Sequence, residues 1–158
     1  MSFVHLHVRS EYSMLEGAIK LKPLFKKLPS LGFPALAITD IGNMMTAVEF
    51  QGMCKDLEKD KEKPTKVQPI LGAELWVSHD RKDPNATPWP MVALCESFEP
   101  GYRNLCKIIS RSYTQSHFNG RPRVDMELVR EFREGIIFLS GGHESEIDRQ
   151  LRSGHFEQ

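Results

Sequence analysis

The sequence predicts an α/β fold with a mostly parallel sheet. Short apolar runs flanked by Gly or Pro alternate with amphipathic stretches of helical period, the order that is typical of βαβ units. Several runs are continuously apolar, as expected of strands that are buried on both faces. Residues able to bind metals stand at or after these runs, where α/β folds carry their chemistry.

Five apolar runs are expected to form strands. Each is dense in apolar side chains, and most are bounded by turn-forming residues. The predicted strands are residues 3–8, 35–39, 69–77, 91–95 and 135–140.

Helical periodicity fills the intervals between these runs. We expect one helix over Leu21–Leu31, a second over about 46–61 and a third over 101–113. The third has apolar residues at i, i+3 and i+4, the pattern of a helix that packs on one face. A further short helix is expected after Ser140.

The size and charge of the chain indicate one globular domain with no strong overall electrostatic field. A chain of 158 residues with 40% hydrophobic and 27% charged residues can bury about 70% of its unfolded surface. The strand–helix series stops after Ser140 without a closing strand, so we expect residues 1–158 to be the N-terminal portion of a longer fold. Twenty-one basic residues balance 21 acidic ones, so any contact with DNA is expected to be only indirect.

The three cysteines favour a reduced, cytoplasmic protein. Cys54, Cys95 and Cys106 are odd in number and have no C-x-x-C spacing, which argues against a disulfide framework or a zinc knuckle. The N-terminus lacks the pattern of a signal peptide, and no apolar run approaches the ~20 residues of a membrane span. We therefore expect no membrane association.

Potential metal ligands fall near the predicted strand ends. His5 and His7 lie two residues apart on the first predicted strand, Asp40 ends the second and Glu74 lies in the third. Histidines at i and i+2 of a strand share a face, as two ligands of one metal would. Alone the spacing is a weak signal, because one packed and one exposed histidine is the more common arrangement.

Five ordered blocks carry a family resemblance. They read HLHVRSEYSMLEG, PALAITDIGNM, QPILGAELWV, EPGYRNLCKIIS and EGIIFLSGG. In this order and spacing, over nearly the whole chain, they resemble the PHP (polymerase and histidinol phosphatase) domain at the N-terminus of the bacterial DNA polymerase III alpha subunit.

The resemblance implies a fold, a chemistry and partners. It implies the N-terminal part of a distorted (β/α)7 barrel, with the rest of the barrel and the polymerase core absent from this chain. Active members hold up to three metals, commonly zinc or manganese, and hydrolyse phosphoesters, which suits metal-activated water. The implied partners are the rest of the alpha chain and the proofreading exonuclease (epsilon) subunit.

Compared with the family pattern, three ligand positions have changed type. Arg9 stands where the second histidine of the H-x-H motif is expected, and a guanidinium stays protonated and cannot coordinate a cation. Ile41 replaces a histidine and has no lone pair. Pro90 or Met91 falls where a further histidine is usual.

Other positions retain ligand types or leave the question open. Gly142 stands where Cys or His is common, although the adjacent His143 could substitute. Glu16 and Glu74 fall where the family places carboxylates. The resemblance therefore implies a vestigial pocket without catalytic residues, bound metal or cofactor, formed by His7, Arg9, Glu16, Asp40, Ile41, Glu74 and Gly142.

Arg9 is expected to supply the charge of the missing ions. Carboxylates left without metal repel one another, and a guanidinium among them relieves that repulsion. We expect Arg9 to pair with a remaining carboxylate such as Glu74 or Asp40; the alternative is that it points to solvent.

Two classes of function follow. The first is a non-catalytic scaffold of the replicative polymerase that also offers a surface to the exonuclease subunit. The second is a metal-dependent phosphoesterase with accessory proofreading or phosphatase activity. The number of ligands distinguishes them, because multinuclear chemistry needs many lone pairs.

Overall fold

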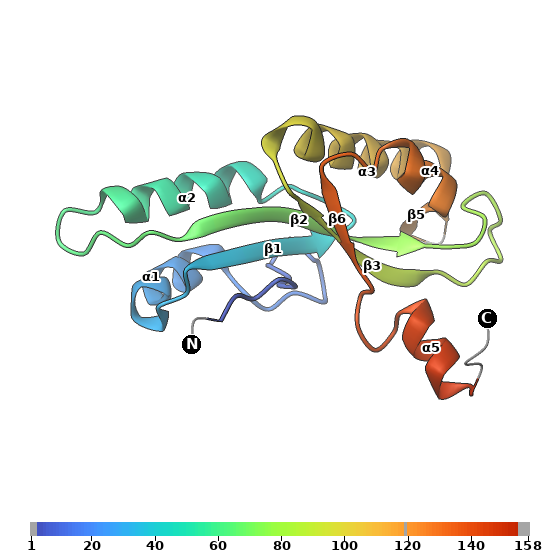
Figure 1. Cartoon of the computed structure of the whole chain (residues 1–158), viewed down its shortest axis with the longest axis horizontal. Helices are drawn as coiled ribbons and strands as arrows, with labels where there is room; N and C mark the ends of the chain where they lie inside the picture. The colour runs from blue at the N-terminus through green and yellow to red at the C-terminus, as the bar shows by residue number, and fades with distance from the viewer. Residues whose placement is uncertain (1–2, 119, 155–158) are drawn as a thin grey trace. The chain divides into compact units, whose positions relative to one another are not determined.

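The fold is divided into two units that share one strand. The structure is a computed structural model that describes residues 3–118 and 120–154. Residues 1–73 form the first unit and residues 74–158 the second. The strand β2 (Gln68–Val77) contributes residues 68–73 to the first unit and residues 74–77 to the second (Figure 1).

The first unit packs two helices with the strand β1. Besides the start of β2, its elements are α1 (Leu21–Leu31), β1 (Ala35–Ile41) and α2 (Ala47–Lys59). Its core is one apolar cluster that includes Phe25 of α1 and Phe50 of α2, whose rings meet edge to face at 5.8 Å. The five central residues of β1 are buried, as the continuous apolar run predicted.

Helix α1 has the predicted bounds because its local signals agree. Three of its apolar residues, Leu21, Phe25 and Leu28, are spaced by four and three and are buried. Gly32 follows in the left-handed conformation at φ 67°, and its N–H donates to the carbonyl of Leu28. A glycine at this position ends a helix without steric cost.

Residues 3–8 do not form the predicted strand. His5 makes an isolated parallel bridge to Leu36, and Ala37 and Thr39 donate backbone hydrogen bonds to His5 and Val8. The N–H of Val8, however, donates to the side-chain Oγ1 of Thr39 at 3.0 Å. A hydroxyl takes the place of a ladder carbonyl there, so the segment lies along β1 without becoming a regular strand.

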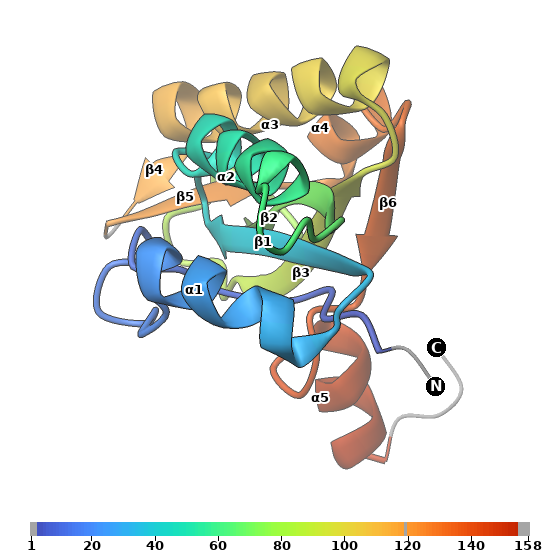
Figure 2. The same cartoon turned by 90° about the vertical axis from the view of Figure 1, so that its left-hand side faces the viewer.

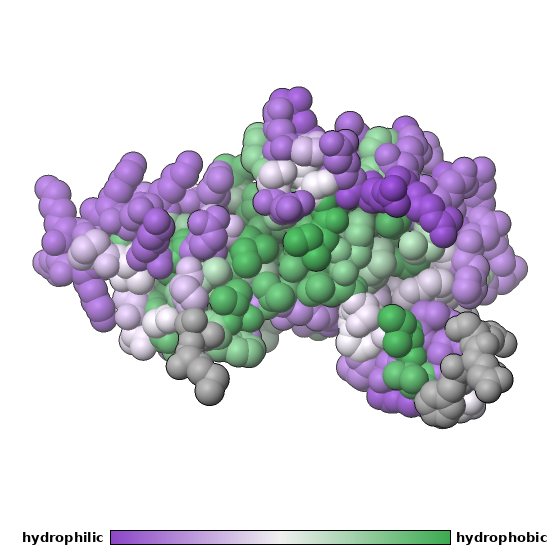
Figure 3. All heavy atoms as spheres, viewed as in Figure 1, coloured by the Kyte–Doolittle hydropathy of each residue, from purple (hydrophilic) through white to green (hydrophobic). Residues whose placement is uncertain are grey.

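The second unit holds the remaining strands and helices. With the end of β2 they are β3 (Trp89–Cys95), η1 (Phe98–Tyr102), α3 (Arg103–Gln115), β4 (His117–Phe118), β5 (Arg121–Val124), α4 (Met126–Glu131), β6 (Ile136–Leu139) and α5 (Glu146–Arg152). Helix α3 packs against β5, and α5 projects away from the other elements of this unit (Figures 1 and 2). The exposed side chains of Ile147 and Leu151 contribute hydrophobic surface to α5 (Figure 3).

The sheet contains both parallel and antiparallel pairs of strands. Its order is β4-β5-β2-β3-β6, and β1 also pairs with β2. β2 and β5 are parallel, with Trp76 opposite Arg123. β3 and β6 are antiparallel, as are β4 and β5. The short turn around Gly120 joins β4 to β5 as a hairpin, which can only be antiparallel.

Four predicted strands and the predicted helices are present with small changes of bounds. The sequence did not predict β4, β5 or α4, which contain only two, four and six residues and no continuous apolar run like that of β6. In the described ranges, 3–118 and 120–154, no helix is long and apolar enough to cross a membrane.

Close backbone contact in the second unit gives a stability prediction. A Cβ at Gly101 would lie 2.1 Å from the carbonyl oxygen of Gly135. This oxygen belongs to the backbone, so it cannot move aside as a flexible side chain could. Gly101→Ala should therefore lower the free energy of unfolding by about 2–4 kcal/mol, measured by urea denaturation. Gly52→Ala is the control, because it lies inside α2 with nothing within 4 Å, and it should raise stability by roughly 0.5–1 kcal/mol. Equal effects of the two substitutions would contradict the contact.

Candidate functional site

The candidate site of the first unit is centred on the buried carboxylate of Asp40. Asp40 lies near the carboxyl end of β1 and is only 1% exposed. Two loops meet its oxygens: residues 9–19, which precede α1, and residues 42–46, which lead into α2. The strand end thus carries a charge into a position where water cannot solvate it, and the loops must do so instead.

Hydroxyl and backbone donors surround both oxygens of Asp40. The N–H of Ser10 donates to Oδ1 at 2.7 Å, and its hydroxyl lies 2.9 Å from Oδ1 and 2.8 Å from Oδ2. The hydroxyl of Ser13 donates to Oδ1 at 2.7 Å and that of Thr46 to Oδ2 at 3.1 Å. Hydrogen bonds to an ionised acceptor are the stronger kind, so this network compensates the burial of the charge.

The same hydroxyls also order the loops. Ser10 Oγ accepts from the N–H of Tyr12 at 3.2 Å, and Ser13 Oγ accepts from the N–H of Ile41 at 3.1 Å. Thr46 occupies the N-cap of α2, but its side chain makes no capping bond and turns to Asp40 instead. A capping hydrogen bond typically stabilises a helix by about 1 kcal/mol. The hydroxyl of Thr46 binds the carboxylate of Asp40 in place of this bond.

Asn43 joins the two loops beside this network. Its amide nitrogen donates to the carbonyls of Tyr12 at 3.1 Å and Ile41 at 3.0 Å, and its oxygen accepts from the N–H of Met45. Gly42 before it has φ 62°, a left-handed conformation that glycine adopts without steric cost.

Arg9 pairs with one of the remaining carboxylates. Its Nη1 lies 3.1 Å from Oε2 of Glu16, and both side chains are partly exposed, at 29% and 44%. Glu16 belongs to the candidate set, but it is neither of the two carboxylates, Glu74 and Asp40, that were named for this pairing. Because solvent reaches this pair, its contribution to stability is at most about 1 kcal/mol.

The histidines of the N-terminal segment are both exposed. The ring of His5 meets Phe3 edge to face at 4.7 Å and Phe33 at 5.0 Å, although the residue is exposed. His7, the retained ligand type, is also exposed.

The donor set in the first unit does not fit the metal cluster that active PHP domains hold. A hydrogen-bond donor already occupies each oxygen of Asp40, Ile41 offers no lone pair, and Arg9 brings a permanent positive charge to Glu16. Among residues 3–118 and 120–154, the structure contains no group of three or more His, Cys, Asp or Glu side chains that could hold a metal ion.

The rim of the site is apolar rather than basic. The two loops and the start of α2 expose several large apolar side chains, and Leu15 is fully exposed with φ 68°. The exposed residues are Tyr12, Met14, Leu15, Met45 and Val48. Loops that approach phosphate usually offer backbone N–H groups and cations, so this rim is better suited to a protein surface.

The other predicted positions belong to the second unit. Glu74 is fully buried at its start, and Gly142 has φ 82° with open space around it. His143 is exposed and lies 3.8 Å from Glu144. Met91 lies within β3, where the carbonyl of Pro90 closely approaches Gly141.

Sequence reasoning missed a buried ion pair in the second unit. Arg81 Nη1 lies 2.6 Å and 2.7 Å from the two oxygens of Asp125, with side chains 12% and 10% exposed. Asp125 also caps α4 by accepting from the N–H of Leu128. Burial raises the pKa of Asp125, but the Leu128 N–H and the Arg81 guanidinium outweigh it, and the pKa lies below its ordinary value. The aspartate three residues before an apolar pair was an available N-cap signal.

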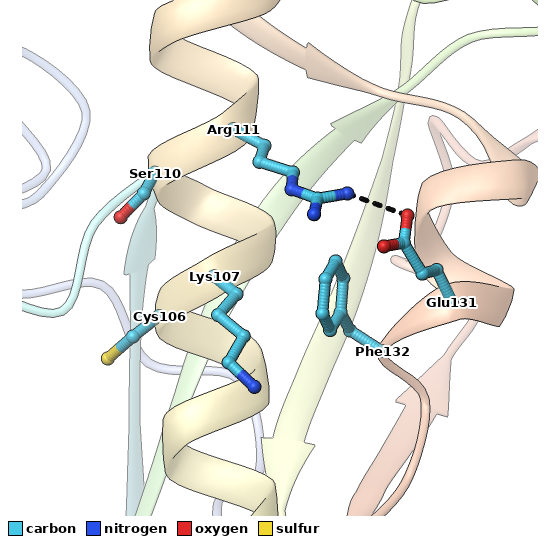
Figure 4. A pocket seen from close by; sticks show the side chains of 6 residues that line it. All are labelled: Cys106, Lys107, Ser110, Arg111, Glu131 and Phe132. Carbon is cyan, nitrogen blue, oxygen red and sulfur yellow. Dashed lines mark hydrogen bonds and ion pairs between the residues drawn. The ribbon is translucent and has the colours of Figure 1, made fainter.

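A surface hollow of about 540 Å³ lies between α3 and α4. Lys107 and Arg111 point toward the ring of Phe132, at 5.3 Å and 4.6 Å from its centre, and Arg111 pairs with Glu131 at 2.7 Å (Figure 4). Each contact joins α3 to the segment of α4, so the cluster serves to hold the two helices together.

The cysteines are free thiols, as predicted. Cys54 is buried and the other two are half-buried. Burial raises the pKa of Cys54 to about 12, so this thiol is an unreactive part of the core at neutral pH.

Comparisons with known proteins show what the chain is similar to. The family model of the PHP domain matches residues 5–158. DNA polymerase III subunit alpha of Pseudomonas fluorescens is 38% identical over 154 residues, and that of Escherichia coli (strain K12) is 37% identical over 153. The alignments cover 98% and 97% of this chain but only 12% of the length of either relative.

One solved structure supports the fold. The structure of Endonuclease Q in complex with a 27-mer duplex substrate is similar with a TM-score of 0.50, 16% identity, 85% of this chain covered and 33% of that chain. At this identity the likeness concerns the fold alone, and it confirms the predicted α/β class and the partial PHP barrel.

The network around Asp40 predicts a localised loss of stability. Ser13→Ala should lower the free energy of unfolding by about 1–3 kcal/mol, because a buried charge loses one donor and the N–H of Ile41 loses its acceptor. Ser30→Ala is the matched control, since its exposed hydroxyl reaches only the carbonyl of Lys27, and it should change stability by less than about 0.5 kcal/mol. Chemical denaturation measures both, and a Ser13 variant as stable as the control would show that the donor is dispensable.

The buried pair of the second unit predicts a dependence on pH. Since the pKa of Asp125 is lowered by folding, its contribution is complete above the unfolded value of about 3.9 and is lost as pH falls through the folded pKa. Arg81→Met should therefore cost about 2–4 kcal/mol at pH 7 and much less near pH 2. The control is Arg103→Met, which breaks an exposed pair with Glu99 and should cost under about 1 kcal/mol at either pH. A cost of Arg81→Met that does not change with pH would refute the linkage.

Proposed function

The chain belongs to the PHP domain family, and from this premise we propose that it is a non-catalytic scaffold domain of a bacterial replicative polymerase. In this proposal it is the PHP portion of a DNA polymerase III alpha subunit, acts in DNA replication in the cytoplasm and carries a degenerate metal site. Nucleotidyl transfer would belong to the rest of the alpha chain. The relatives that support this context are alpha subunits of which the chain spans 12%.

The observation that carries the proposal is the state of the Asp40 carboxylate. Metal ligation needs lone pairs directed at one point, whereas the oxygens of Asp40 receive hydrogen bonds from Ser10, Ser13 and Thr46. Opening the carboxylate to a metal would break bonds that also hold both loops. This cost opposes metal binding even if the metal could reach the site.

Arg9 and Ile41 support the same conclusion independently. A cation would approach Glu16 against the charge of Arg9, and displacing Arg9 would leave a guanidinium to be paired elsewhere. Ile41 supplies an alkyl group directly after Asp40, at the end of β1. We derive no hydrolytic step for this chain, because the residues present do not assemble a metal-bound nucleophile.

Docking of the proofreading exonuclease subunit is part of the proposal. The apolar rim formed by Tyr12, Met14, Leu15, Met45 and Val48 supports a protein partner, because methionine-rich exposed surfaces adapt to apolar side chains. The equal numbers of basic and acidic residues support an indirect rather than a direct role at DNA.

The alternative is a metal-dependent phosphoesterase. It is favoured by His7 and Glu16, which keep ligand types at two family positions, and by the exposure of His7. Against it, Glu16 already pairs with Arg9, whose positive charge would repel a metal ion bound by His7 and Glu16. We therefore rank this function second.

Metal titration tests the proposal. The chain should bind neither zinc nor manganese with a stoichiometric calorimetric transition, and should not hydrolyse p-nitrophenyl phosphate when either metal is added. The matched comparison is the variant Arg9→His and Ile41→His, which returns two imidazoles to the loops and should bind zinc more tightly than the parent. Tight stoichiometric metal on the parent chain after dialysis would overturn the scaffold proposal and favour the phosphoesterase.

A further inference from the structure

A groove of about 480 Å³ lies between α1 and α2 in the first unit. Its floor is apolar and its two edges are charged. The floor consists of Phe25, Pro29, Met53 and Leu57. The edges are Lys22 and Lys26 on α1, and Asp56 on α2 with Asp60 directly after its end.

The two edges carry opposite charges that do not neutralise each other. Within each edge the two residues are four apart, so they stand one helical turn from each other along the groove. In the part of the chain that the structure describes, no ion pair joins the lysines to the aspartates. The groove therefore keeps a positive edge and a negative edge separated by apolar side chains.

Asp60 is held in place and held ionised. Its Oδ1 accepts hydrogen bonds from the N–H of Glu62 at 2.8 Å and of Lys63 at 2.9 Å. These bonds, that from Lys63 first, lower the pKa of Asp60. The negative edge is thus anchored at the end of α2, where the chain turns away from the helix.

The charge pattern selects the kind of ligand. A nucleic acid backbone would be attracted by the lysines and repelled by an equal number of aspartates. An apolar floor provides no donors for a small anion and no ligands for a metal. An amphipathic peptide meets all three surfaces at once, because it can offer apolar side chains to the floor and opposite charges to the two edges.

We propose that this groove binds an amphipathic helix of a partner protein, with apolar residues at i, i+3, i+4 and i+7 on the floor, acidic residues toward Lys22 and Lys26, and basic residues toward Asp56 and Asp60. A third helix laid between α1 and α2 would cover the half-buried side chains of Met53 and Leu57. The edge charges determine specificity and register, and the floor provides most of the affinity. This site is independent of the metal site and of the function proposed above.

Three labelled synthetic peptides with one common leucine face are the probes. The first has glutamates on one flank and lysines on the other, the second has glutamates on both flanks and the third has lysines on both. Fluorescence anisotropy with the 158-residue chain should show the tightest binding for the first peptide. Equal binding of all three, or no binding of any, would overturn the proposal.

Charge reversal at one edge should change the preference. Lys22→Glu with Lys26→Glu makes both edges acidic, so binding of the first peptide should weaken roughly tenfold and the peptide with two lysine flanks should bind best. All four substituted lysines of this variant and its control lie on exposed helix surface, so circular dichroism should show unchanged folding.

The control matches the charge change outside the groove. Lys27→Glu with Lys55→Glu alters the net charge by the same amount on α1 and α2, but neither residue lines the groove. It should leave the order of the three peptides and the affinity of the first within about twofold. If the control variant shifted the preference as far as the groove variant does, the effect would be one of overall charge and the groove would not be the site.

Discussion

The burial of one carboxylate, Asp40, determines the structure of the first unit around the candidate site. A carboxylate that is 1% exposed must receive hydrogen bonds from the protein, because desolvation without them would cost several kcal/mol. Ser10 and Ser13 supply these bonds from the loop before α1, and Thr46 supplies one from the loop before α2, 36 and 33 residues further along the chain. The strand end, the entry to α1 and the entry to α2 are therefore coupled through one side chain.

This network and metal binding exclude each other for a physical reason. A divalent ion would hold loops together by drawing carboxylate oxygens toward itself, whereas hydroxyl donors hold the same loops by surrounding the oxygens. Hydroxyl donors can satisfy Asp40 without the additional carboxylate or histidine ligands that a metal ion requires. An alkyl side chain such as Ile41 can therefore follow Asp40. The positive charge of Arg9 meets the negative charge of Glu16 in the outer part of the same loop. In the scaffold proposal, these contacts do at this end of β1 what a metal ion would do in an active relative.

Sequence patterns predicted the helices and strands whose signals lie within one short segment. They failed for segments whose structure depends on pairing with a distant strand. Leu21–Leu31 was predicted with its bounds because periodicity and Gly32 agree. Residues 3–8 have strand composition, but the hydroxyl of Thr39 replaces a ladder partner, and only the position of β1 reveals this. The strand β5 contains only Arg121–Val124 and depends on its neighbours β2 and β4 for its existence. No window of the sequence contains that information.

Residue types at family positions predict a weak metal site, but they could not predict the hydrogen-bond network around Asp40. Arg9 and Ile41 are recognisable as non-ligands from chemistry alone. Ser10, Ser13 and Thr46 look like ordinary loop and cap residues, since hydroxyls are common at turns and helix starts. Their role depends on an aspartate near the end of a buried strand, so it becomes visible only when the loops are placed. The loss of ligands stays a prediction from residue types, whereas the three-dimensional arrangement gives Asp40 a role of its own: it is the acceptor of hydrogen bonds from both loops.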